Sequence, residues 1–139
     1  MHTVLFWLRS TSVCMYPKEG IQAQSFEIPN HEACKCEEIL TSKSGKKVIL
    51  AVIYRSPQNV QFIEHIERSL NYVSNWSLPI ILVGDFNYDL LKNNLTSRVL
   101  TDTFNRQCMD QLVDKPTRIA QGSSTLIDHI WTNERDSRG

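Results

Sequence analysis

Two polar residues follow directly after an apolar run near the middle of the chain. The run Ile80–Val83 ends in Gly84, and Asp85 and Asn87 then place a carboxylate and a carboxamide two residues apart. Such a run predicts a buried strand, in which residues i and i+2 share one face. Strand geometry through Asn87 would point both side chains at one ligand atom. A carboxylate can take a proton or face a metal, and an amide donates and accepts hydrogen bonds. The pair therefore suits phosphate-ester chemistry.

The same two residues also have a structural interpretation. Asp and Asn hydrogen-bond to nearby backbone groups and therefore favour turns after strands. Taken alone, the motif favours a structural turn slightly over catalysis. A catalytic interpretation needs further polar residues at the ends of neighbouring strands.

Length and composition predict a single globular domain. The chain has 139 residues, of which 41% are hydrophobic and 22% charged, and its formal net charge is zero. This length allows one substantial core but not two. Zero net charge argues against avid non-specific binding of nucleic acid, which requires a basic face. We expect one domain over residues 1–133 and a polar tail over residues 134–139.

The cysteines and the apolar segments indicate an intracellular, soluble protein. Cys34 and Cys36 are spaced to share one face of a strand, but the sequence shows no second ligand pair for zinc. Buried free thiols in a reducing compartment are therefore the preferred interpretation. The apolar run Val4–Leu8 is too short for a signal peptide, and no segment reaches membrane-spanning length. We expect a nuclear or cytoplasmic location and no membrane partner.

A change of apolar period predicts a strand–helix–strand unit in the middle of the chain. Residues 48–54 are almost all apolar and rich in β-branched side chains, which predicts a buried strand. Residues 60–76 then carry apolar side chains four, four and three positions apart, which predicts a helix. Pro79 bars the helix from continuing and opens the next strand. Two apolar strands joined by a helix indicate a buried sheet that is covered by helices.

Weaker patterns predict the remaining elements. Thr96 or Ser97 can cap a second helix, whose inward side chains are expected to be Val99, Leu100 and Phe104. Residues 122–124 predict a turn. The other expected elements are strands at 4–8, 21–28, 34–40 and 126–131, an extended piece at 109–113, and the end of the second helix near residue 106.

Three further polar sites lie at the expected ends of strands. Tyr54 ends the buried strand, Thr117 precedes the last strand, and Asp128 lies inside that strand. Four polar sites in this order, counting Asp85 and Asn87 as one, are far more specific than any one of them.

The order of these sites resembles the endonuclease/exonuclease/phosphatase superfamily, and more narrowly the endonuclease domain of jockey-like and CR-one-like non-LTR retrotransposons. The matching segments are VILAVIYRSP, PIILVGDFN, PTR and SSTLIDHIWTN, within residues 48–133. The resemblance implies a two-sheet α/β sandwich with helices on its outer faces. It also implies Mg²⁺-dependent nicking of target-site DNA, with a reverse transcriptase domain as partner in a longer polyprotein.

The resemblance implies a role for each of five residues. Asp85 resembles the aspartate that orients and deprotonates the attacking water. Asn87 resembles the asparagine that holds a phosphate oxygen while charge develops on it. Tyr54 is similar to a tyrosine whose hydroxyl contacts the phosphate, and Thr117 to a threonine that contacts the nucleic-acid backbone. Asp128 resembles the aspartate that supports the catalytic histidine and fixes its tautomer.

Two features of the family have no counterpart in this sequence. They are the metal-binding glutamate of the first strands and the final Ser-Asp-His segment with the catalytic histidine, so the chain resembles a family member truncated at both ends. His129 is not that histidine, because strand alternation points it away from Asp128, and we expect a packed or surface position. Binding of Mg²⁺ by this chain is expected to be weak, and little activity is expected from the chain alone. Exposed sheet edges are expected to make it poorly soluble.

Two other interpretations remain open at this stage. One is a non-catalytic remnant or interaction protein that uses the surviving sheet. The other is a different phosphoesterase of the same superfamily, acting on lipids or nucleotides. The segments YRSP and TLIDHIWTN favour the retrotransposon branch over this second alternative.

Overall fold

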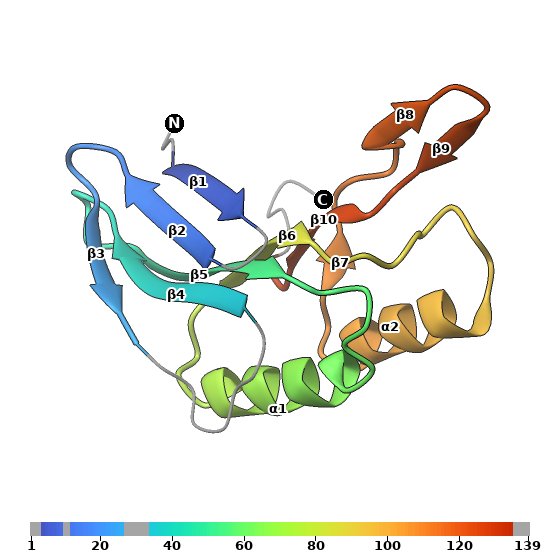
Figure 1. Ribbon diagram of the computed structural model, residues 1–139. Helices are drawn as coiled ribbons and strands as arrows, with labels where there is room; N and C mark the ends of the chain where they lie inside the picture. Colours follow the sequence, from blue (N-terminus) through green and yellow to red (C-terminus); the bar gives the residue numbers. More distant parts are fainter. Residues whose placement is uncertain (1–3, 10–11, 27–33, 135–139) are drawn as a thin grey trace.

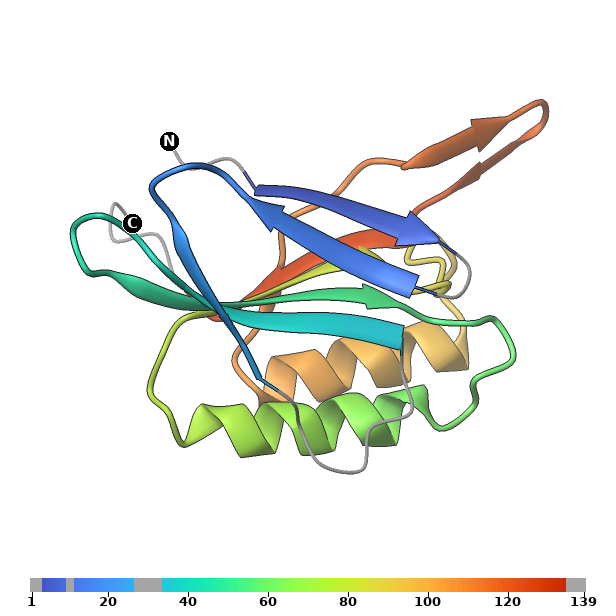
Figure 2. The ribbon, with the colours of Figure 1, turned by 60° about the vertical axis from the view of Figure 1, so that its left-hand side comes forward.

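A six-stranded sheet lies between two helices and a β-hairpin in the computed structural model, which describes residues 4–9, 12–26 and 34–134 (Figures 1 and 2). Strands β5 and β6 run parallel, and every other neighbouring pair in this sheet is antiparallel. In spatial order the strands are β3 (Gln22–Ser25), β4 (Cys34–Thr41), β5 (Lys47–Tyr54), β6 (Ile80–Asp85), β10 (Asp128–Thr132) and β7 (Asp110–Gln111).

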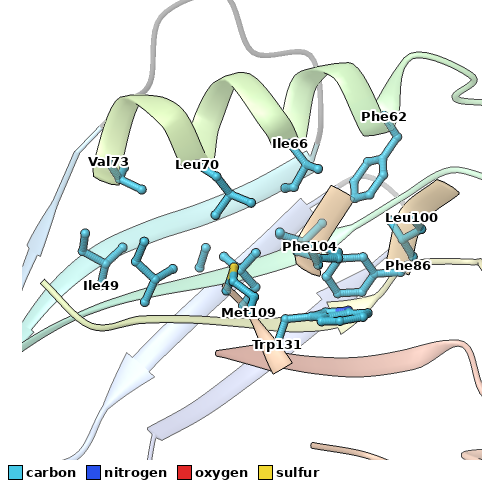
Figure 3. Packing of buried hydrophobic residues seen from close by; sticks show 14 of the residues in the cluster. Ile49, Phe62, Ile66, Leu70, Val73, Phe86, Leu100, Phe104, Met109 and Trp131 are labelled. Atoms are coloured by element: carbon cyan, nitrogen blue, oxygen red, sulfur yellow. The ribbon is translucent and has the colours of Figure 1, made fainter. Parts of the chain in front are cut away.

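The predicted strand–helix–strand unit forms the centre of the molecule. The helix α1 (Phe62–Ser74) connects β5 to β6, as a parallel pair requires. Figure 3 shows the α1 side chains Ile66, Leu70 and Val73 directed toward the sheet. Burial of this apolar face holds the helix on the sheet, since a helix of this length is only marginally stable alone. The main core cluster lies here, between the sheet and both helices.

A hairpin covers the other face of the sheet. Strands β1 (Val4–Arg9) and β2 (Ser12–Pro17) pair with each other, and Met15 of β2 is buried against the sheet. Figure 2 shows this hairpin on the side opposite to α1 and α2 (Leu95–Arg106). The predicted α/β class with two sheets is therefore confirmed. A second apolar cluster lies between this hairpin and the sheet, and its buried residues are Met15, Leu40, Leu50, Val52 and Val83.

The second helix differs from the prediction at its start and on one face. Asn94 is the N-cap, and its side-chain oxygen accepts a hydrogen bond from the Ser97 backbone N–H at 2.9 Å. The predicted cap at Thr96 or Ser97 is therefore wrong. Val99 is 40% exposed, because it lies one position off the stripe that buries Leu100, so its predicted inward position is also wrong. Leu100 and Phe104 are fully buried, as predicted.

Three strands of the structure, β2, β8 (Arg118–Ala120) and β9 (Ser123–Thr125), are absent from the prediction. The hairpin β8–β9 extends from the body of the molecule, and residues 123–124 belong to a strand where a turn is predicted. Its exposed side chains show no apolar alternation, the pattern from which strands are predicted. The last strand begins at Asp128 rather than 126, and the piece at 109–113 contains only β7.

Some expectations fall on residues that the structure does not describe. These are the end of the strand predicted at 21–28 and the tail beyond residue 134. Cys34 and Cys36 lie in β4, but their side chains are outside the described part, and their shared face stays a prediction. Cys108 is exposed just after the end of α2, so the prediction of a buried thiol is wrong for this residue. No helix among the described residues is long and apolar enough to cross a membrane.

Replacing Gly84 is expected to disrupt the pairing of β5 with β6. Gly84 has a φ of 145°, and a Cβ atom there would lie 1.8 Å from the Ile53 carbonyl oxygen. Gly84→Ala is therefore expected to lower the free energy of unfolding by about 3 kcal/mol or more. Gly122→Ala is the matched control, since Gly122 also has a positive φ, of 77°, but has no atom within 4 Å of the added Cβ. Its expected cost is about 1 kcal/mol. Urea denaturation measures both, and equal losses would contradict the close approach.

Candidate active site

Three strand ends bring three of the predicted residues into one row. Strands β5 and β6 run parallel and end at the same edge, whereas β10 is antiparallel to β6 and begins there. Tyr54 pairs with Asp85 in register, and Asp85 pairs with Asp128. Residues directly opposite each other in a sheet project from the same face. A phenol and two carboxylates therefore lie side by side at this edge, on the face away from the helices.

Asp85 is the buried member of the row. Its side chain is only 7% exposed, although a carboxylate is costly to bury unless its oxygens are bonded. The backbone N–H of Asn87 donates to Oδ1 at 3.0 Å, and Nη2 of Arg118 donates to Oδ2 at 2.7 Å. Both oxygens thus have a donor, one from the loop after β6 and one from the hairpin β8–β9.

The surroundings of Asp85 alter its acidity. Burial raises the pKa of the Asp85 carboxyl above its ordinary value, and the Asp128 carboxylate adds to that rise. The Asn87 backbone N–H and the Arg118 guanidinium act in the opposite direction by favouring the charged form. A raised pKa makes this carboxylate a stronger base, once it is ionised, than an exposed aspartate.

Asn87 lies beside Asp85, but not through strand alternation. The strand ends at Asp85, and Asn87 has a φ of 51°, in the left-handed region that Asn tolerates. The prediction that strand geometry points both side chains at one ligand atom is wrong. The cause is the bond from the Asn87 backbone N–H to the Asp85 carboxylate, which turns the chain. The Asn87 side-chain amide instead donates to the carbonyl of Arg55, in the loop after β5.

The buried Arg55 joins the loops that follow β5 and β6. Its Nη1 donates to the Asn87 carbonyl at 3.0 Å, and its Nε donates to the Asn59 carbonyl at 3.2 Å. Its guanidinium carbon lies 3.9 Å from the centre of the Tyr88 ring, a cation–π contact. The sequence pattern gives this arginine no role, although it adjoins Tyr54 in the YRSP segment. Its effect is to hold the backbone on which Asn87 sits.

Thr117 and Arg118 connect the base of the hairpin β8–β9 to the candidate site. The Thr117 hydroxyl accepts a hydrogen bond from the Asp128 backbone N–H at 3.2 Å. The Thr117 backbone N–H donates to the Thr125 carbonyl at 2.9 Å. Nε of Arg118 lies 3.9 Å from Oδ2 of Asp128, so one guanidinium faces both carboxylates. The position of Thr117 beside Asp128 accords with the predicted grouping. Arg118 has no role in the prediction, and its only sequence signal is its place after Thr117.

His129 is packed in the core on the opposite face of β10. It is 1% exposed, and its ring stacks on Phe86 with centroids 4.8 Å apart. The indole N–H of Trp131 donates to Nδ1 at 3.2 Å, so the proton is on Nε2, which donates to the Tyr88 carbonyl at 2.9 Å. The predicted packed position is confirmed.

The described residues do not by themselves fit a magnesium site. Among them, no three His, Cys, Asp or Glu side chains are grouped to hold a metal ion. The two carboxylates of the row, Asp85 and Asp128, both face the Arg118 guanidinium. A cation already occupies the position that a metal between them would need, and Mg²⁺ demands near-ideal octahedral oxygen geometry.

Similar solved structures identify the fold. The endonuclease domain of TRAS1, a telomere-specific non-LTR retrotransposon, matches with a TM-score of 0.72 at 13% identity, over 96% of this chain and 67% of that one. The catalytic domain of human Nocturnin matches with a TM-score of 0.63 at 13% identity, over 96% of this chain and 60% of that one. The chain has the endonuclease/exonuclease/phosphatase fold. An endonuclease/exonuclease/phosphatase family protein of Bacteroides thetaiotaomicron matches with a TM-score of 0.57 at 15% identity, over 95% of this chain and 59% of that one.

The likeness concerns the fold, and the chain spans about three fifths of the Nocturnin domain. No protein-family model and no curated protein matches the sequence significantly. The arrangement of residues at the sheet edge, rather than an overall sequence similarity, therefore carries any inference about activity.

His129 is expected to make stability fall on mild acidification. Burial lowers the pKa of its imidazole below the ordinary 6.5, so below about pH 6.5 the unfolded chain takes up a proton that the folded chain refuses. The free energy of unfolding should decrease from pH 7.5 to pH 5.5, by at most about 1.4 kcal/mol per pH unit from this residue. His129→Gln is expected to be less stable at pH 7.5 but to show a shallower decrease. Chemical denaturation at several pH values measures this, and equal slopes would contradict the buried neutral imidazole.

Proposed function

We propose that this chain supplies the water-activating and phosphate-binding residues of a phosphodiester-cleaving DNA endonuclease of the retrotransposon type. The observation that carries the proposal is the row of Tyr54, Asp85 and Asp128 across three neighbouring strands. Asn87 and Thr117 are hydrogen-bonded to the two acids of that row. Five residues from four separate segments of the sequence thus lie at one edge of the sheet.

Asp85 acts as the general base in this proposal. It accepts a proton from a water molecule while the water oxygen forms a bond to phosphorus and the bond from phosphorus to the leaving ester oxygen breaks. A buried carboxylate with a raised pKa suits this task, because it accepts a proton more readily than an exposed one. The leaving oxygen takes up a proton from solvent, so the reaction gives a phosphate monoester at one end and a free hydroxyl at the other.

The amide and the phenol stabilise the charge that develops on the phosphate. One N–H of the Asn87 side chain is bonded to the Arg55 carbonyl, which leaves the second N–H of the amide group for a phosphate oxygen. The Tyr54 hydroxyl is a second donor in the same row. Donors held in place before the reaction stabilise the transition state without reorganisation.

Support for DNA as substrate comes from the fold and the matching segments. The TRAS1 structure, an endonuclease domain of a retrotransposon, has a TM-score of 0.72 with this chain. The segments YRSP and TLIDHIWTN resemble that branch of the superfamily. The proposal includes a reverse transcriptase domain as partner, a nuclear or cytoplasmic location, and Mg²⁺ as the cofactor, which this chain alone is expected to bind weakly.

Cleavage of supercoiled plasmid tests the proposal. The protein encoded by the complete reading frame is expected to nick the plasmid in Mg²⁺, and Asp85→Asn is expected to slow nicking about 100-fold or more, because an amide cannot take the proton. The 139-residue chain alone is expected to nick little or not at all. Arg106→Gln is a matched control: Arg106 lies on α2, is 61% exposed and pairs with Glu67. Its nicking rate should equal the wild-type rate.

The outcomes separate the three interpretations. Asp85→Asn nicking at the wild-type rate would contradict the proposed base. A complete protein that leaves plasmid intact but hydrolyses a nucleotide or lipid phosphate is a different phosphoesterase. A protein with neither activity is a non-catalytic member of the fold.

A further inference from the structure

The ion pair between Arg118 and Asp85 joins an exposed guanidinium to a buried carboxylate. The Asp85 side chain is 7% exposed, at the end of a buried strand, whereas the Arg118 side chain is 60% exposed. Their contact is short, at 2.7 Å, as expected for a charge-assisted hydrogen bond. Because the arginine is largely solvated, breaking the pair costs the guanidinium little, whereas the carboxylate stays where the sheet holds it.

The backbone of Arg118 is held while its side chain can turn. Arg118 begins β8, and the hydrogen bonds of Thr117 to Asp128 and Thr125 fix the residue just before it. The rest of the hairpin projects from the body of the molecule (Figure 2). Nε of Arg118 lies 3.9 Å from the Asp128 carboxylate, which keeps the guanidinium near the site even without Asp85. A movement confined to the side chain is therefore enough to change its partner.

The present position of Arg118 conflicts with the work of a general base. Oδ1 of Asp85 already accepts the Asn87 backbone N–H, and Oδ2 is the oxygen that Arg118 contacts. A water that is to lose its proton must approach this carboxylate closely, within about 3 Å. While Arg118 contacts Oδ2, its guanidinium limits the approach of a water molecule to the Asp85 carboxylate.

We infer that Arg118 is an exchangeable counter-ion, which binds Asp85 in the free protein and moves to the phosphate when a phosphodiester binds. The inference rests on the proposed function and names the residue that couples substrate binding to the base. Phosphate oxygens accept guanidinium N–H groups in the same two-pronged geometry as a carboxylate, so the cation remains paired throughout. The exchange frees Oδ2 for the water. It also takes a positive charge away from Asp85, which makes the carboxylate a stronger base when substrate is present.

Titration of Asp85 by carboxyl NMR tests the exchange without requiring cleavage. Asp85 faces Arg118 from β8, Asp128 from β10 and Tyr54 from β5. A thymidine dinucleotide with one phosphodiester is expected to raise the Asp85 titration midpoint in the 139-residue chain. Arg118→Gln should raise the midpoint without ligand, leave only the smaller further rise that the phosphate charge itself causes, and weaken dinucleotide binding about tenfold. Arg106→Gln should behave as wild type, and the uncharged methylphosphonate dinucleotide should leave the midpoint unchanged.

Three results would overturn the exchange. They are an Asp85 midpoint that Arg118→Gln does not change, a dinucleotide-induced rise that is as large in Arg118→Gln as in the wild type, and no binding of the dinucleotide by the wild-type chain. Plasmid nicking by the complete protein separates this inference from the proposed function. Arg118→Gln with wild-type kcat and KM, beside an inactive Asp85→Asn, overturns the exchange and leaves the endonuclease standing. An active Asp85→Asn overturns the proposed function itself.

Discussion

The parallel pairing of β5 with β6 is the constraint on which the candidate site depends. Because α1 crosses between the two strands, both end at the same edge of the sheet, and Tyr54 lies opposite Asp85. The strands approach closely at Gly84, where a side chain would collide with the Ile53 carbonyl. Since β10 is antiparallel to β6, its first residue, Asp128, reaches that same edge. Groups remote in the sequence are therefore neighbours through backbone geometry, before any side-chain interaction is considered.

Two buried charges of opposite sign, those of Arg55 and Asp85, then hold the loops at this edge through hydrogen bonds. Arg55 and Asp85 are 8% and 5% exposed, and the Arg55 backbone N–H donates to the Asp85 carbonyl at 2.9 Å. Burial of such groups is favourable only when their hydrogen bonds are satisfied, so each fixes the loop that supplies its partners. Arg55 fixes the loop that carries Asn87, and Asp85 draws in the backbone of that same loop. Arg118 is the exposed charge in this network, and the chemistry inferred for it follows from that difference.

The sequence predicts the apolar elements well because their patterns depend on burial. Strands β5 and β6 and helix α1 appear within two residues of their expected bounds. The clustering of Tyr54, Asp85 and Asp128 also follows, since polar residues at the ends of neighbouring strands must meet. Their catalytic roles stay predictions, as do those of Asn87 and Thr117.

Details decided by competing polar interactions are not predicted. The prediction places the cap of α2 at Thr96 or Ser97, whereas the structure uses Asn94, a residue type that caps helices equally well. The left-handed turn at Asn87 depends on whether a local hydrogen bond prevails over strand continuation. The hairpin β8–β9 is almost entirely exposed, so no burial pattern marks its strands, and the ion pair of Arg118 depends on where that hairpin emerges.

Adjacent residues of strand β10 point to opposite faces of the sheet. Asp128 lies in the row with Asp85 and Tyr54, whereas His129 lies between the rings of Phe86 and Trp131 on the opposite face. A slip of this strand by one residue would move every side chain to the opposite face, so that Asp128 would point to the apolar side with the helices and His129 to the side of Asp85. Neither environment tolerates that exchange, so the alternation of charge and aromatic packing along five residues gives β10 a single admissible alignment with its neighbours.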